Sequence, residues 1–348
     1  MTDALEYNKA QDYSKSEVAF IQRRVGSSPD GAWGPNTVAA IERWQKAHRI
    51  HQDGKVRRSM EGNTWPRLLA AGADAWSKGT PGITRVGLWT FSSACRSSSE
   101  ECGSNFATAT SAQVTDISFT VNSATEPSFA PPVSAEDVAE TGKRYRDAGI
   151  DVSVNAFIYP SADFVDALVD YVLDIDARVG LRRLDVDAEE LWIRNGDQQA
   201  HDSAAALFGK RLAAADFAIA INGIVYTNYD ALDPLIRQDC VTHILPQAYS
   251  TAGHLDKQGA PDRVYNPIDL QALAVRKWTS WWPTKKLLGG FATYDQPGSY
   301  ELGTLTEELA LGLALRTWAD SGVDEVVGWS AKQVSEVGAS VLRERQRK

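Results

Sequence analysis

Eight short runs of apolar and β-branched residues, separated by stretches with helical periodicity, limit what this chain can fold into. The predicted strands span residues 85–91, 114–121, 151–159, 182–189, 217–226, 242–249, 286–293 and 325–329, and amphipathic helices are predicted over 134–149, 163–180, 201–215, 269–282 and 305–322. Strands and helices that alternate in this way form βαβ units with a parallel sheet. The pattern predicts an α/β fold, a (β/α)8 barrel, with an open doubly wound sheet as the alternative.

A Gly-Thr-Pro-Gly break at residues 79–82 separates this segment from a shorter helical one. The 348 residues are 43% hydrophobic, which is enough to give a soluble protein of this length a buried core. We therefore predict two domains, an all-α domain over residues 1–78 and the barrel over residues 82–348.

Charge is unevenly distributed along the chain. The net charge is −9, yet residues 1–80 carry twelve basic and nine acidic side chains, so the rest of the chain carries −12. An acidic barrel disfavours nucleic acid as a partner, because phosphate binding needs clustered positive charge. A small basic domain on an acidic body indicates instead an anchor for an anionic surface.

The sequence lacks the signatures of several other kinds of protein. It has no run of about eighteen uninterrupted apolar residues, so no membrane span is predicted. It has no zinc-like Cys/His spacing and no phosphate-binding loop, and we expect neither a metal nor a cofactor. Cys95, Cys102 and Cys240 are too few for a disulfide scaffold, and whether Cys95 and Cys102 pair is left open.

The first domain has helical spacing over residues 18–25, followed by Gly26 as a stop signal. Asn36 or Thr37 is expected to cap the next helix. An Asp-Gly turn precedes that helix and a second Asp-Gly turn precedes the following one, so the domain has an internal repeat.

These turns carry a specific resemblance. The string Ile21-Gln22, Asp30-Gly31-x-Trp33-Gly34-Pro35-x-Thr37, Trp44-Gln45, Asp53-Gly54-x-Val56, Thr64-Trp65 and Leu68 resembles the three-helix peptidoglycan-binding domain of cell-wall hydrolases. The resemblance implies a wall-binding module, whose motif residues are Asp30, Gly31, Trp33, Gly34, Trp44, Asp53 and Gly54. The alternative is an ordinary helical bundle with both tryptophans in the core, and for Trp44 itself a core position is favoured.

Three acidic residues mark the candidate active site. Strand residues alternate between faces, so Asp185, Asp187 and Glu189 are expected to point into the barrel, and Glu189 lies at the carboxyl end, where barrel active sites lie. Carboxylates this close cannot all ionise freely, so at least one pKa should rise. A carboxylic acid that stays protonated near neutral pH can protonate a glycosidic oxygen. The alternative is an ion network with Arg182 or Arg183.

The same three residues resemble the DxDxE motif of the chitinase-like family 18 glycoside hydrolases. The resemblance implies that Glu189 is the general acid/base, that Asp187 orients the substrate's 2-acetamido group, and that Asp185 supports Asp187. The acetamido oxygen then replaces an enzyme nucleophile. Tyr249 is expected to bind the acetamido oxygen, although Ser250 stands where that family has Asp.

Further sugar contacts are expected from strand ends. Trp329 resembles the tryptophan on the last strand that forms the floor of the sugar-binding site in that family. The alternative, that Trp329 is a core residue at the end of the barrel, is nearly as well supported. The candidate substrate-binding residues are Trp329, Asn155, Tyr226, Asn228 and Gln247, and weaker candidates are Tyr159, Asn222 and the Trp281-Trp282 pair.

A second resemblance is to the family 25 lysozymes, whose DxE pair Asp187 and Glu189 also match. That family has an Asp on its first strand, and residues 85–91 contain none, so this reading ranks second.

These expectations combine into a monomeric, endolysin-like cell-wall hydrolase that binds peptidoglycan and cuts the glycan strand. The alternatives are a chitinase of free polymer and a non-catalytic sugar-binding barrel. The residues do not distinguish cleavage after N-acetylmuramic acid from cleavage after N-acetylglucosamine. Because the first residues lack a signal-peptide pattern, we expect delivery to the periplasm or wall by lysis or a secretion system.

Overall fold

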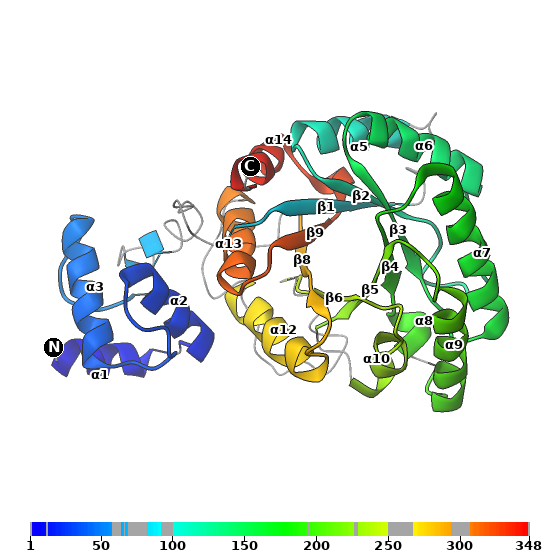
Figure 1. Cartoon of the computed structure of the whole chain (residues 1–348). Helices are drawn as coiled ribbons and strands as arrows, with labels where there is room; N and C mark the ends of the chain where they lie inside the picture. The colour runs from blue at the N-terminus through cyan, green and yellow to red at the C-terminus, as the bar shows by residue number, and fades with distance from the viewer. Residues whose placement is uncertain are drawn as a thin grey trace.

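A parallel barrel surrounded by helices forms the larger part of the computed structural model, and a helical module lies beside it (Figure 1). The structure describes residues 2–11, 13–57, 64–65, 67–68, 82–91, 100–193, 195–225, 229–249, 267–293 and 307–346. The strands are β1 (Arg85–Thr90), β2 (Asp116–Thr120), β3 (Asp151–Phe157), β4 (Arg183–Asp187), β5 (Ala218–Ile224), β6 (His243–Gln247), β7 (Lys286–Leu287), β8 (Gly289–Ala292) and β9 (Glu325–Trp329).

Pairing between the strands closes the sheet. The order is β5-β4-β3-β2-β1-β9-β8-β6-β7, and β5 also pairs with β6 in parallel. Every predicted run contains a strand, and β7 and β8 are two pieces of the seventh run. The barrel prediction is therefore confirmed, and the alternative of an open sheet is wrong because the pairing of β5 with β6 closes the ring of strands.

Helices cover the outside of the barrel (Figure 1). They are α5 (Glu100–Ser111), α6 (Ala135–Asp147), α7 (Ala162–Val179), α8 (Glu190–Ile193), α9 (Gln198–Arg211), α10 (Tyr229–Ile236), α12 (Pro267–Trp281), α13 (Glu307–Asp320), the 3-10 turn η3 (Ala331–Gln333) and α14 (Glu336–Arg345). The five predicted helices are present. Helix α9 begins earlier than residue 201, because the Asp197 side chain caps it by accepting from the backbone N–H groups of Gln199 and Ala200.

Alternation along the strands separates two packing layers. On β4, Leu184 and Val186 are fully buried in the cluster between sheet and helices, and Ala188 joins them just past the strand. Asp185 and Asp187 point the other way, into the barrel, as the alternation predicted. Each large apolar side chain buried in this way contributes about 1.5–3 kcal/mol.

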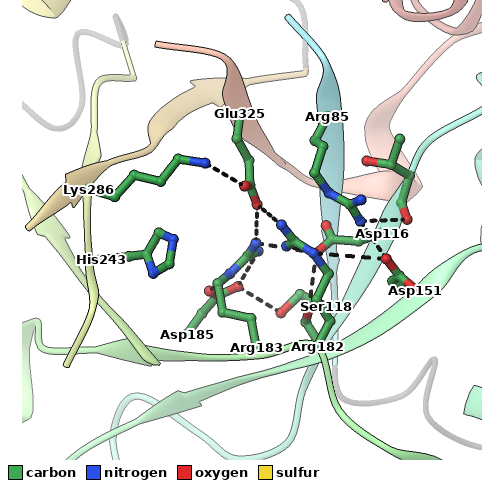
Figure 2. A network of polar contacts seen from close by, with 12 residues as sticks. Arg85, Asp116, Ser118, Asp151, Arg182, Arg183, Asp185, His243, Lys286 and Glu325 are labelled. Carbon is green, nitrogen blue, oxygen red and sulfur yellow. Dashed lines mark hydrogen bonds and ion pairs between the residues drawn. The ribbon is translucent and has the colours of Figure 1, made fainter. Parts of the chain in front are cut away.

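An ion network fills the amino-terminal half of the barrel interior (Figure 2). Arg183 is 1% exposed in its side chain and lies within ion-pair distance of Asp116, Asp185 and Glu325, with 2.6 Å between its Nη1 and Glu325 Oε1. Gly87 on β1 makes room for this network, since a Cβ there would lie 1.9 Å from Asp116 Oδ1.

The network also sets the charge of its members. Burial opposes the charge of Arg183, but the three surrounding carboxylates raise its pKa overall. Burial alone would raise the pKa of Glu325, and Arg183 and Arg182 hold it below its ordinary value. Burial and the nearby arginines lower the pKa of His243 to about 4, so this imidazole is neutral at neutral pH.

The small module is built from α1 (Thr2–Ala10), α2 (Lys15–Val25) and α3 (Pro35–Ala47). Helix α2 ends at Gly26 in a left-handed conformation, as expected. Helix α3 starts at Pro35 with Gly34 as its N-cap, so the expected cap at Asn36 or Thr37 is wrong. Helix α1 was not predicted from the sequence, and the predicted domain boundary at residues 78–82 falls largely outside the described residues.

Each Asp-Gly turn of the module is closed by one glutamine. Gln22 Nε2 donates to Asp30 Oδ1 at 2.7 Å, to the Ala32 carbonyl at 2.9 Å and to Thr37 Oγ1 at 3.1 Å. Its Oε1 accepts from the Gly31 N–H at 2.8 Å. Gly31 has φ +72°, a backbone conformation that glycine adopts without strain.

The second turn repeats this arrangement around Gln45. Its Nε2 reaches Asp53 Oδ1, the Lys55 carbonyl and Thr64 Oγ1 at 3.1–3.2 Å, and its Oε1 accepts from the Gly54 N–H at 2.8 Å. The internal repeat predicted from the two Asp-Gly turns is therefore present as a structural repeat.

Candidate active site

A cavity of about 200 Å³ opens at the carboxyl ends of the barrel strands. Its described lining residues come from β1, β3, β4, β6 and β9 or lie just beyond them: Trp89, Phe157, Asp187, Glu189, Gln247, Tyr249 and Trp329. Five of these were predicted from the sequence, namely Asp187, Glu189, Gln247, Tyr249 and Trp329. The closed barrel therefore brings together residues separated by more than half of the chain.

Asp187 and Glu189 form a carboxyl pair on the cavity wall. Asp187 is 6% exposed, whereas Glu189 is half-buried and sits two residues further along, past the end of β4. Burial raises the pKa of Asp187 well above its ordinary value, and the hydrogen-bonded carboxyl group of Glu189 raises it further. The pair therefore retains a proton at a pH where isolated carboxyl groups have lost theirs, as the sequence predicted for this cluster.

Asp185 lies beneath this pair and belongs to the ion network. Its Oδ2 accepts from Trp89 Nε1 at 3.0 Å and from Ser118 Oγ at 2.9 Å, and its carboxylate is bound by Arg183. The side chain is fully buried and does not line the cavity. The alternative of an ion network is thus realised at Asp185, while its negative charge contributes to the raised pKa of Asp187.

A ladder of amide side chains holds Gln247 against Asp187. Gln247 Nε2 lies 3.3 and 3.4 Å from the two Asp187 oxygens and donates to Asn222 Oδ1 at 2.9 Å. Asn222 Nδ2 donates to Asn155 Oδ1 at 3.1 Å, and Asn155 Nδ2 donates to Thr120 Oγ1 at 3.2 Å. Because each amide in this chain fixes the orientation of the next, the Gln247 N–H groups face Asp187. This donation lowers the pKa of Asp187 and so moderates its rise.

Aromatic rings form much of the remaining wall. Trp329 lies with its ring centroid 6.2 Å from that of Trp89 and 4.9 Å from that of Phe91. Tyr249 is 6% exposed and packs in the apolar cluster inside the barrel. A flat, partly apolar wall beside a pair of carboxyl groups suits a sugar ring, which presents apolar C–H faces and polar edges.

Some predicted residues take other places. Asn155 is 1% exposed and does not line the cavity, so it supports Gln247 through the amide chain instead of making the expected sugar contact. Asn222 is also buried, does not line the cavity and has the same supporting role. Tyr159 packs against the apolar cluster between the sheet and the helices. Trp281 and Trp282 pack against each other and Tyr229.

Tyr226, Asn228, Ser250 and Cys95 lie outside the described residues, and Cys102 is buried in α5. Trp89 and Phe157 were missed as lining residues. Both follow the inward parity of their strands, so the alternation that identified the acids would have identified them too.

The wall-binding motif residues are engaged within the module. Both aspartates are bound by the glutamines, both Asp-Gly glycines have positive φ, and Gly34 caps α3. Trp44 is 8% exposed in the module's apolar cluster and Trp33 packs against that cluster. The motif therefore determines the fold of the module, and its contact with the wall stays a prediction.

Within the described residues, no group of three or more His, Cys, Asp or Glu side chains is placed to hold a metal ion. In that same part of the chain, no helix is both long and apolar enough to cross a bilayer.

We predict that Asp187→Asn stabilises the fold in a pH-dependent way. The folded-state pKa of Asp187 is raised, so stability is lost as pH rises from the ordinary aspartate pKa through the folded one. Asparagine cannot titrate, so its gain should be small near pH 4 and reach on the order of 1 kcal/mol at neutral pH. Urea unfolding at both pH values measures this.

The matched control is Asp185→Asn. This substitution weakens the contact with Arg183 and should destabilise the protein at both pH values. A stabilising effect of Asp187→Asn that did not change with pH would contradict the raised pKa.

Comparison with known proteins supports both parts of the architecture. The family model described as "Putative peptidoglycan binding domain" matches residues 16–58, which contain all of α2 but its first residue, all of α3 and both Asp-Gly turns. This segment therefore belongs to a peptidoglycan-binding domain family, as its resemblance implied. No curated protein sequence matches the chain.

Many solved structures are similar to this chain, and three of those that share the barrel fold are the following. The spore cortex-lytic enzyme SleL of Bacillus cereus is 12% identical, with 78% of this chain and 76% of that chain covered at a TM-score of 0.51. SleL of Bacillus megaterium QM B1551 is 11% identical, with coverage of 95% and 84% at a TM-score of 0.52. A GH18 chitinase from Pseudoalteromonas aurantia is 13% identical, with coverage of 75% and 100% at a TM-score of 0.52. At these identities the likeness establishes the fold.

Proposed function

We propose that this protein is a glycoside hydrolase that cuts the β-1,4-linked glycan of peptidoglycan beside a 2-acetamido sugar. The observation that carries the proposal is the proton-sharing Asp187–Glu189 pair on an aromatic-lined cavity at the carboxyl ends of the strands. The peptidoglycan-binding module on the same chain supports the choice of polymer. The solved structures that share the fold include enzymes described as spore cortex-lytic and as chitinases.

Glu189 is the proposed general acid. It is the more exposed member of the pair, so it is the one that a glycosidic oxygen can reach. Protonation of that oxygen lets the leaving sugar depart as an alcohol, and the resulting carboxylate then accepts a proton from the attacking water.

Asp187 is the proposed partner of the acetamido group. Among the described lining residues the only carboxyl groups are Asp187 and Glu189, and both come from the end of one strand. The described lining of the cavity thus holds no separate carboxylate nucleophile opposite this pair. The acetamido oxygen of the substrate is then the nucleophile that attacks the anomeric carbon. Asp187 accepts a hydrogen bond from the acetamido N–H and stabilises the positively charged ring that this attack forms.

Tyr249 and Trp329 complete the proposed sugar site. The Tyr249 hydroxyl is proposed to donate to the acetamido oxygen, and the Trp329 ring is proposed to stack under the sugar; both residues line the cavity. The module holds the barrel at its polymer, and such tethering raises the local concentration of glycan around the active site.

The decisive experiment is digestion of purified sacculi, followed by reduction and mass spectrometry of the soluble products. The expected products are reduced disaccharide peptides, because a glycosidase leaves a new reducing end. Whether the reduced sugar is N-acetylglucosamine or N-acetylmuramic acid identifies the bond. Digestion of chitin alongside tests the chitinase alternative, and products with new amino termini but no new reducing ends would refute a glycosidase.

A further inference from the structure

The small module packs directly on the barrel through α2, which contacts α12 (Figure 1). Ile268 of α12 and Leu313 of α13 are each 1% exposed and complete the module's own apolar cluster. Arg24 of the module forms a buried ion pair with Asp320 of α13, which Arg316 also binds at 2.8 Å. These contacts give the module a defined seat on the barrel.

A second cavity, of about 260 Å³, lies at the seam where the module meets the barrel, and residues of both parts line it. We call it the seam cleft. The module contributes Lys15, Arg23 and the Asp30-Gly31 turn, and the barrel contributes Arg276 together with apolar surface from α12 such as Val275. Neither part alone forms this cleft.

Positive charge dominates the seam cleft although the chain as a whole is acidic. Lys15 and Arg276 are exposed and form no ion pair with any described residue, while Arg23 lies 3.7 Å from Asp320. The described lining holds one acidic side chain, Asp30, against these three cations, and Asp30 also accepts from Gln22 and from the Ala32 N–H. The cleft therefore offers unneutralised cations to an anionic ligand.

The lining also distinguishes a peptide from a sugar. Among the described residues of the seam cleft none is aromatic, so it lacks the flat rings that line the barrel cavity. Small apolar side chains such as Ala19 and Ala272 lie between the cations instead. This combination fits a short peptide with small side chains and free carboxylates.

We propose that the seam cleft binds the carboxylate-bearing stem peptide of peptidoglycan, through Lys15 and Arg23 from the module and Arg276 from the barrel. The inference rests on the proposed function and deepens it, because a stem peptide held at the seam orients its glycan strand relative to the barrel mouth. The seam cleft then recognises the peptide of the polymer, and the barrel cavity recognises its sugars.

Calorimetric titration of the full chain with the free stem tetrapeptide, its carboxylates intact, tests the proposal. Lys15→Ala and Arg276→Ala should each weaken binding about tenfold, because each removes one charge-assisted contact. Lys210→Ala, which removes an exposed cation from α9, is the matched control and should leave binding unchanged. The same peptide with its carboxylates esterified should not bind.

Asp320→Ala separates a two-sided cleft from simple charge attraction. Loss of this carboxylate makes the seam more positive, so charge alone predicts tighter binding of the peptide. Loss of the Arg24–Asp320 contact loosens the module's seat, so a cleft built from both parts predicts weaker binding. Tighter binding by Asp320→Ala, or an unchanged affinity of Arg276→Ala, would overturn the proposal.

Hydrolysis of a neutral chito-oligosaccharide keeps this inference distinct from the proposed function. The seam variants should hydrolyse it at the rate of the unaltered protein, since the barrel cavity is intact. An active enzyme that does not bind the tetrapeptide refutes the seam site alone. A protein that binds the tetrapeptide but hydrolyses neither substrate refutes the proposed glycosidase and leaves the seam site standing.

Discussion

Replacement of Glu189 by Gln should lower the rate of glycan hydrolysis by about three orders of magnitude, because loss of a positioned proton donor typically costs 10²–10⁴-fold. Glutamine keeps the size and polarity of the side chain, so binding to sacculi and thermal stability should be preserved. Release of soluble fragments from sacculi, together with initial rates on a chito-oligosaccharide, measures the effect. Glu136→Gln, at an exposed acid in the first turn of α6, is the control and should retain full activity.

The pH profile gives this experiment a second readout. Since burial and Glu189 raise the pKa of Asp187, the pair should keep its shared proton well above the ordinary carboxyl range, and activity should fall as that proton is lost. In Glu189→Gln the neighbouring negative charge is absent, so the pKa of Asp187 should fall. Retention of full wall-clearing activity by this variant would instead support a non-catalytic sugar-binding barrel.

The second large effect is expected on stability. Arg183→Met should lower the free energy of unfolding by about 3–5 kcal/mol, because it leaves buried carboxylates without their charge partner. Arg183 contacts Asp116, Asp185 and Glu325 inside the barrel, where little water can replace it (Figure 2). Urea unfolding at neutral pH, followed by circular dichroism, gives the difference.

A surface arginine provides the control for this prediction. Arg211 also binds two carboxylates, Asp166 and Asp170, but on the solvent-exposed side of α7. Arg211→Met should change stability little, because water and salt screen an exposed pair. Equal effects of the two substitutions would show that burial is not what makes the Arg183 network important.

The parts of the fold that depend on local periodicity were predictable from the sequence. Alternation along β4 placed Leu184 and Val186 on the helical side and Asp187 in the interior, and each is found there. The same alternation points Arg183 into the barrel, so the ion network at Asp185 could also be predicted from the sequence. The start of α3 was mispredicted because Pro35 can occupy the first helical turn without a side-chain cap.

The site contacts that were not predicted depend on register between strands distant in sequence. The ladder from Thr120 through Asn155 and Asn222 to Gln247 joins β2, β3, β5 and β6. Each of these residues alone is an ordinary polar residue near a strand end. Only the pairing of the strands brings their amides into hydrogen-bond distance, and with them the orientation of Gln247 toward Asp187.

The two glutamine-closed turns of the module have equivalent architecture but unequal neighbours. The first, at Asp30-Gly31, borders the barrel. The second is covered by the amino-terminal helix, where Asn8 accepts from the Val56 N–H and donates to the Gly54 carbonyl. The two turns thus have equivalent surfaces, and α1 covers the surface of the second turn. A shortened chain without α1 would expose Gly54 and Val56, which are now buried, and would leave their backbone groups to hydrogen-bond with water.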